Sequence, residues 1–258
     1  MYNIHAVLKI AIRTWQLPVT SILLFGVFST LAGQNTDQLI KLTRFHMVAG
    51  QETAFIAENA QLGQAFDSQS DSPCFVYLYS DHTFEFSVPA QVKEAEALPE
   101  QLPNHFPGQV NLSSAVSKQD NRIEQYQSDL SYGGPVERLP AKMSGETYLE
   151  VVTYRVLPGN SAAVMEKLRK YPELMQEINS PVVFDCYTYQ GEDESIFFEL
   201  VYPAEDPDDL AERRAIQEAT LTRPLQRWRK EILLLVDQLS KVTGHFVYEL
   251  SSPVDQRS

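Results

Sequence analysis

The chain has 258 residues and a formal net charge of −13 at pH 7, with 34 acidic against 21 basic side chains. This acidic excess argues against nucleic acid and anionic lipid as partners, because both are bound through clustered lysine and arginine. Apolar residues make up 43% of the chain, which is enough for a sizeable core and argues against a disordered protein.

Residues 1–33 have the layout of a secretory signal peptide. Lys9 and Arg13 precede an apolar run over 17–31, and the small residues Ala32 and Gly33 offer a cleavage site. The run is short for a membrane-spanning helix, which needs about 20 residues, although an uncleaved anchor is the alternative. We therefore expect export to a periplasmic or secreted location, with no membrane attachment once the segment is removed.

The first part of the mature chain reads as strand, helix, hairpin and strand. Alternate residues are apolar on both faces of the first strand, which predicts a central position in a sheet. The proline-rich stretch 89–108 interrupts the place of a second helix. The expected elements are a strand over 39–48 ended by Gly50, a helix over 52–66, strands over 74–80 and 83–88, and a strand over 122–127.

The second part repeats this order with better helices. Asp206-Pro207 reads as an N-cap followed by proline in the first helical turn. The expected elements are a strand from Tyr148 that ends at Pro158-Gly159, a helix over 161–178, strands over 182–189 and 196–202, a helix over 207–219, a longer helix over 222–242 and a last strand over 245–250.

Three landmarks recur at nearly constant spacing and indicate an internal repeat. Gly50 and Gly159 are 109 positions apart, Pro73 and Pro181 are 108 apart, and Leu130-Ser131 and Leu250-Ser251 are 120 apart. The predicted boundaries are a signal peptide at 1–33, a first unit at 38–135, a linker at 136–145 and a second unit at 146–253. Each unit has the ferredoxin-like order β-α-β-β-α-β. We expect an α+β protein in which the two tandem units bury their bare sheet faces against each other as one barrel.

The segments VTYRVLPGN, QSDLSYGGP and YELSSP carry a resemblance to a known superfamily. They are similar to the dimeric α/β-barrel proteins, in particular the antibiotic-biosynthesis-monooxygenase-like and NIPSNAP-like branches and exported bacterial proteins with two such units in tandem. Ala49 departs from the proline of the Pro-Gly turn. The resemblance implies an intrachain barrel. It does not imply one function, because the superfamily includes oxygenases, haem proteins, isomerases and ligand binders.

Polar residues on one face of the two central strands are the candidate ligand site. Arg44, His46 and Arg155 are expected to point into the barrel, where arginine would bind an anionic or carbonyl-bearing small molecule. The alternative is that they pair with interior acids such as Asp185 and Glu199. Tyr187 and His245 complete the predicted set.

Three functional classes stay open. They are a small-molecule binder, a cofactor-independent or haem-linked oxygenase-type enzyme with His46 or His245 as the haem ligand, and an interaction module that dimerises. The sequence has no HxH, HExxH or CxxC spacing and no phosphate-binding loop, so no metal and no cofactor is predicted. The expected partner is a small-molecule ligand, and the expected state is a monomeric pseudo-dimer or a homodimer. Cys74 and Cys186 are expected to be buried thiols, and the alternative is a disulfide bridge between them, which export would permit.

Overall fold

The computed structural model describes residues 38–60, 62, 73–90, 115–133, 140–191 and 193–252. The predicted signal peptide and most of the proline-rich stretch lie outside these residues. The first half of the chain contains strands β1 (Leu39–Met47), β2 (Phe75–Tyr79), β3 (Thr83–Ala90) and β4 (Val116–Tyr126), helix α2 (Glu52–Asn59) and the 3-10 turn η3 (Ser128–Leu130).

The second half contains the same strand order with longer helices. Its elements are a short helix α5 (Ala141–Ser144), strands β5 (Tyr148–Val156), β6 (Asp185–Gln190), β7 (Ile196–Ala204) and β8 (Val236–Phe246), and helices α6 (Ser161–Glu177), α7 (Pro207–Ala219) and α8 (Arg223–Ile232).

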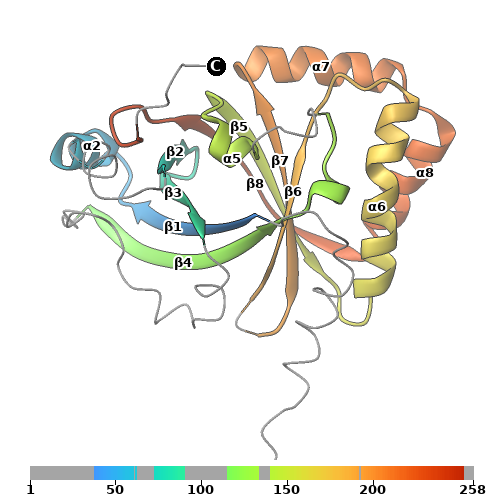
Figure 1. The fold of residues 1–258 in the computed structure, drawn as a ribbon, viewed down its shortest axis with the longest axis horizontal. Coiled ribbons are helices and arrows are strands. Elements are labelled where there is room, and N and C mark those ends of the chain that lie inside the picture. Colours follow the sequence, from blue (N-terminus) through green and yellow to red (C-terminus); the bar gives the residue numbers. More distant parts are fainter. Residues whose placement is uncertain are drawn as a thin grey trace, which may run out of the picture. The chain divides into compact units, whose positions relative to one another are not determined.

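The eight strands form one closed antiparallel barrel in the order β1-β3-β2-β8-β5-β7-β6-β4 (Figure 1). The order divides into two equal sheets, β4-β1-β3-β2 and β8-β5-β7-β6, which we call the first and second half-barrels. Each has the strand order of a ferredoxin-like sheet, and they meet at two seams, β2–β8 and β4–β6. The predicted pair of α+β units within one barrel is confirmed.

Each half-barrel closes a seam with a serine from its own end. The Ser131 hydroxyl, after β4, accepts a hydrogen bond from the Cys186 backbone N–H in β6 at 2.9 Å. The Ser251 hydroxyl, after β8, accepts one from the Val76 backbone N–H in β2 at 2.9 Å. The repeated Leu-Ser landmark therefore marks where each half-barrel is hydrogen-bonded to the other. The serine hydroxyls accept hydrogen bonds from strand N–H groups that would otherwise lack partners.

The alternation along β1 sorts its side chains as predicted. Phe45 and Met47 face outward and pack with Phe55 of α2. Ile40 and Leu42 face the barrel interior, together with Tyr187 and other residues of the second half-barrel. Helices α6, α7 and α8 cover the outer face of the second half-barrel (Figure 1), where Trp228 stacks on Tyr171 at 4.1 Å between ring centroids.

The long helix predicted over 222–242 is wrong. Helix α8 ends at Ile232, and Val236 already pairs with Val156 of β5. The apolar residues after Ile232 continue a helical spacing, so periodicity did not show the boundary. The chain turns at 233–235 and continues as the strand that closes the barrel, so the predicted strand over 245–250 is the end of β8 and the turn after it.

Cys74 and Cys186 are both free and buried, as predicted. Burial raises the pKa of both thiols, so they stay protonated at neutral pH. Among the described residues, no helix combines the length and the apolar character that crossing a membrane requires.

Candidate functional site

Six charged side chains meet inside the barrel, and we call them the central charge cluster: Arg44, Glu85, Arg122, Glu124, Lys142 and Glu199. The Lys142 ammonium lies 2.9 Å from a Glu124 carboxylate oxygen, 3.0 Å from Glu199 and 3.5 Å from Glu85. Lysine and all three glutamates are 0% exposed. Three cations therefore face three carboxylates in a buried volume, and the cluster is neutral.

The two arginines cover one side of this cluster. Arg44 binds Glu85 at 2.5 Å, and Arg122 binds Glu124 at 2.5 Å and Glu199 at 2.7 Å. Each arginine side chain keeps 19% exposure. The cluster thus reaches solvent only through its cations, which are already paired.

The surrounding charges set the protonation of the three glutamates. Burial alone would raise the pKa of each one. For Glu199, the nearby Arg122, Lys142 and Arg44 outweigh burial and hold the pKa well below its usual range. The pKa of Glu85 is lowered in the same way, chiefly by Arg44. Burial prevails at Glu124, whose pKa is raised, so it is the glutamate that takes up a proton most readily.

Lys142 reaches the cluster because α5 lies inside the barrel. This single helical turn starts after Pro140 and ends at Gly145, whose φ of 69° is left-handed and suits glycine. The Ala141 backbone N–H donates a hydrogen bond to the Asp185 carboxylate, and the Tyr77 hydroxyl donates one to the Ala141 carbonyl at 3.3 Å. Both half-barrels therefore hold α5 in place.

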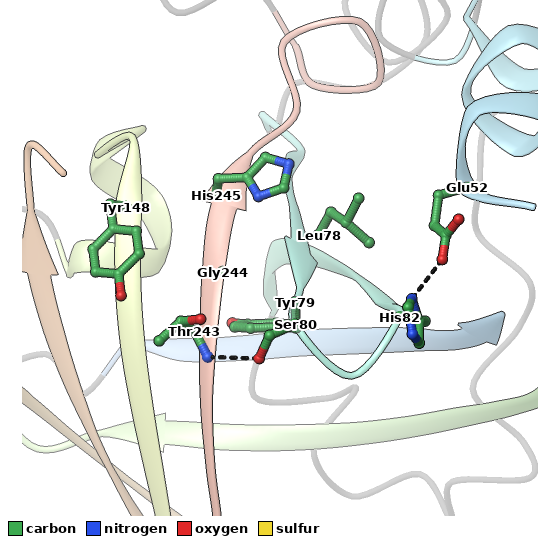
Figure 2. Close-up of a pocket in the computed structure, with 9 residues that line it drawn as sticks. All are labelled: Glu52, Leu78, Tyr79, Ser80, His82, Tyr148, Thr243, Gly244 and His245. Carbon is green, nitrogen blue, oxygen red and sulfur yellow. Dashed lines mark hydrogen bonds and ion pairs between the residues drawn. The ribbon is translucent and has the colours of Figure 1, made fainter. Parts of the chain in front are cut away.

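A separate groove lies at the β2–β8 seam (Figure 2). Its volume is about 400 Å³. The end of β2, the turn after it, the start of β5, the start of α2 and β8 all contribute to its wall. The lining residues are Glu52, Leu78, Tyr79, Ser80, His82, Tyr148, Thr243, Gly244 and His245.

His82 and Glu52 are in contact through their side chains at one side of the groove. His82 sits in the tight turn between β2 and β3 with a left-handed φ of 63°. Its Nδ1 lies 2.6 Å from a Glu52 carboxylate oxygen (Figure 2). Glu52 opens α2, where hydrogen bonds from its own and the Gly50 backbone N–H lower the carboxyl pKa. The pair fixes this wall, and the His82 side chain remains 51% exposed.

His245 and Tyr148 form the other side of the groove. They are register partners on β8 and β5, and Leu78 of β2 is the register partner of His245 across the seam. Figure 2 shows the imidazole of His245 beside the Leu78 side chain. His245 is exposed, so its ring can donate or accept a hydrogen bond to a bound molecule.

Gly244 opens the groove to an interior tyrosine. A Cβ at this position would lie 2.6 Å and 2.7 Å from two ring carbons of Tyr79, so only glycine leaves room for the ring. The Tyr79 hydroxyl donates a hydrogen bond to Glu85 at 3.0 Å. Tyr79 therefore connects the groove to the central charge cluster.

No protein-family model and no curated protein matches this chain. Among solved structures, an anthrone oxidase-like protein matches with a TM-score of 0.53 and 12% identity over 83% of this chain and 93% of its own. The fold is the dimeric α/β barrel. A protein provisionally assigned as a chlorite dismutase matches this α/β barrel with a TM-score of 0.50 and 12% identity, over 83% of this chain and 97% of its own.

A Lactobacillus acidophilus protein provisionally assigned as a monooxygenase matches over 84% of this chain and 96% of its own, with 10% identity and a TM-score of 0.48. At such identities a structural likeness establishes the fold alone, and a fold hosts many functions. The function of this α/β barrel therefore has to be inferred from its own side chains and not from the fold.

The five residues predicted to bind ligand do not meet at one place in the α/β barrel. Arg44 belongs to the central charge cluster, and its 3.5 Å pair with Glu199 matches the alternative prediction of interior ion pairs. His46 pairs with Asp120 at 2.7 Å, and Arg155 pairs with Asp237 at 2.9 Å. Tyr187 is buried inside with its ring 4.9 Å from the Lys142 ammonium, and His245 alone lines the groove. Their role in binding stays a prediction.

Sequence reasoning missed most of the central charge cluster. Glu85 lies between Phe84 and Phe86 on β3, and a charge between two apolar residues of a strand is a signal that it points to the opposite face. Arg122 and Glu124 lie two positions apart on β4 and therefore share one face of the strand. Lys142 gave no such signal, because it lies in the predicted linker and joins the cluster only through the path of α5.

Proposed function

We propose that this α/β barrel binds a small organic molecule in the groove at the β2–β8 seam. The observation that carries the proposal is that His82, His245 and Tyr148 all line a groove of about 400 Å³. Ligand sites in proteins are typically concave volumes of about 300–1,000 Å³ with a few polar groups placed on apolar walls. The central charge cluster is a weaker candidate, because its charges are mutually paired.

The groove favours a planar and mostly apolar ligand with one acceptor group. Leu78 supplies apolar surface, and the Tyr79 ring packs against Gly244 in the wall of the groove. The imidazole of His245 supplies a donor for a carboxylate, phenolate or carbonyl oxygen. Glu52 is occupied by His82, so it does not repel an anion as an unpaired carboxylate would.

Titration of the ¹⁵N-labelled protein with 2-naphthoate, a planar aromatic carboxylate, tests the groove. We expect backbone amide shifts at 78–82 and 243–245, and co-purified compounds of similar chemistry in native mass spectra. His245→Ala should weaken binding about tenfold, because a hydrogen bond to a charged group contributes about 1.5–3 kcal/mol.

His46→Ala is the matched control, since His46 is also a partly exposed histidine near a strand end but does not line the groove. It should leave 2-naphthoate binding unchanged. If His46→Ala removes binding and His245→Ala does not, the site lies with Arg44 and His46 as first predicted, and the groove proposal is wrong.

We also propose that the mature chain is exported and begins after Ala32 or Gly33. The support is the pattern of basic, apolar and small residues over 1–33. Expression with an intact N-terminus should yield a periplasmic or secreted protein whose intact mass corresponds to cleavage at one of these positions. A full-length mass in a membrane fraction would support the uncleaved anchor instead.

A further inference from the structure

The buried charges are distributed unequally between the two half-barrels. On the first, Arg44 faces Glu85 across the β1–β3 pair, while the equivalent pair on the second is Thr153 and Glu199. Arg122 pairs in register with Leu42, while its counterpart Val242 pairs with Val151. To the central charge cluster, the strands of the first half-barrel thus contribute two arginines and two glutamates, and those of the second contribute one glutamate and no cation.

Glu199 has its cationic partners outside its own half-barrel. Its carboxylate binds Arg122 at 2.7 Å and lies 3.5 Å from Arg44, both on the first half-barrel. Lys142, from the connecting segment, completes the set at 3.0 Å. Thr153 adds a hydrogen bond at 3.0 Å but no charge. A buried carboxylate without a cation is costly, so Glu199 requires the first half-barrel as its neighbour.

We infer that the central charge cluster is a pairing code, which makes the inner face of the second half-barrel accept the first half-barrel and reject a second copy of itself. Two second half-barrels would bring two buried Glu199 carboxylates together and no strand arginine. A barrel of two first half-barrels would leave the second half-barrels of both chains without a partner. The partner that fits is therefore a first half-barrel, supplied here by the same chain.

The serine contacts at the two seams do not make that distinction. Ser131 and Ser251 bind strand N–H groups in the same way at the two seams, so these contacts are alike for either kind of partner. Strand pairing through the backbone is also independent of side-chain charge. Specific pairing between similar surfaces generally uses a repulsive element against the wrong partner, and Glu199 supplies it.

Two full-length variants with swapped charges test the code. In Glu199→Lys, four cations would face two glutamates within one chain. In Arg44→Glu, two cations would face four glutamates. When the two variants are mixed, the first half-barrel of one chain can pair with the second half-barrel of the other. Each of the two mixed barrels then holds three cations and three carboxylates, so neither has an excess of one charge. The variants are produced separately and together, each with its own affinity tag.

Each variant alone should lose its cooperative thermal transition, or melt at least about 10 °C below the natural chain. Produced together, they should co-purify through both tags as a 1:1 heterodimer of twice the mass of one chain, with a cooperative transition. Arg44→Glu/Glu199→Lys in a single chain should fold as the unmodified chain does, because its charges balance internally.

Either of two results would overturn the inference. One is that the double variant folds while the two single variants, produced together, form no heterodimer. The other is that the double variant fails to fold, because this would mean that the identity of the residues matters and not their complementary charge.

Discussion

Replacing Lys142 with methionine is expected to destabilise the barrel by about 3–5 kcal/mol at pH 7, the typical cost of removing one partner from a buried ion pair. The change leaves three buried glutamates against two arginines. Methionine keeps the length and most of the volume of lysine, so the loss reflects charge and not a cavity. Urea unfolding followed by tryptophan fluorescence and circular dichroism measures it.

The loss in the free energy of unfolding caused by Lys142→Met should become smaller as the pH falls from 7 to 5. In the natural protein the pKa of Glu199 and Glu85 is lowered, so their stabilising contribution is present above the unfolded pKa near 4.3 and is lost as the pH falls through the folded values. Without Lys142 the pKa of all three glutamates rises. One of them, Glu124 first because its pKa is already raised, then takes up a proton and restores neutrality.

Two further variants separate charge from shape. Lys142→Met/Glu124→Gln is neutral again and should regain most of the lost stability, which a double-mutant cycle would register as a large coupling energy. Lys170→Met, which removes an exposed lysine paired with Glu166 four residues away on α6, should leave the unfolding curve unchanged. A Lys142→Met barrel that is as stable as the natural one at pH 7 would contradict the buried-charge account.

Substituting Gly244 with alanine should destabilise the protein by about 1–3 kcal/mol and abolish binding in the groove. The added methyl would lie 2.6 Å from a ring carbon of Tyr79. That ring is only 3% exposed, and its hydroxyl is bound to Glu85, so it cannot move aside cheaply. Thermal unfolding and the 2-naphthoate titration measure the two effects.

Tyr79→Leu provides the control for this clash. A smaller side chain at position 79 leaves room for the methyl, so Gly244→Ala should cost much less in the Tyr79→Leu background than in the natural chain. Equal costs in both backgrounds would mean that the ring contact is not the cause.

The strands and the repeat were readable from local patterns. The alternation in Leu39–Met47 predicted both its central position and its outward and inward faces, because a strand places successive side chains on opposite sides. The recurrence of Leu-Ser after the last strand of each repeat predicted equivalent ends, and the structure gives these serines the same role at the two seams.

The end of α8 was not readable in this way. Ile232, Leu235 and Leu239 continue a helical spacing, yet the chain changes to β8 at Val236. The strand forms because β5 and β2 both need a partner to close the barrel, and their backbone groups are satisfied only by pairing with β8. The strands that require this pairing are far from β8 in the sequence, so the local pattern of residues does not predict it.

The sequence by itself determined the α+β class, the inward face of the central strands and the burial of both cysteines. Tertiary structure decided the candidate site. Lys142 meets Glu85, Glu124 and Glu199 from three strands, and the groove joins the start of α2 to β2, β5 and β8. Local patterns report which face a residue takes. Strand register and the path of α5 through the barrel decide which charges and which histidines become neighbours. Both depend on all eight strands closing together, so no local pattern predicts them.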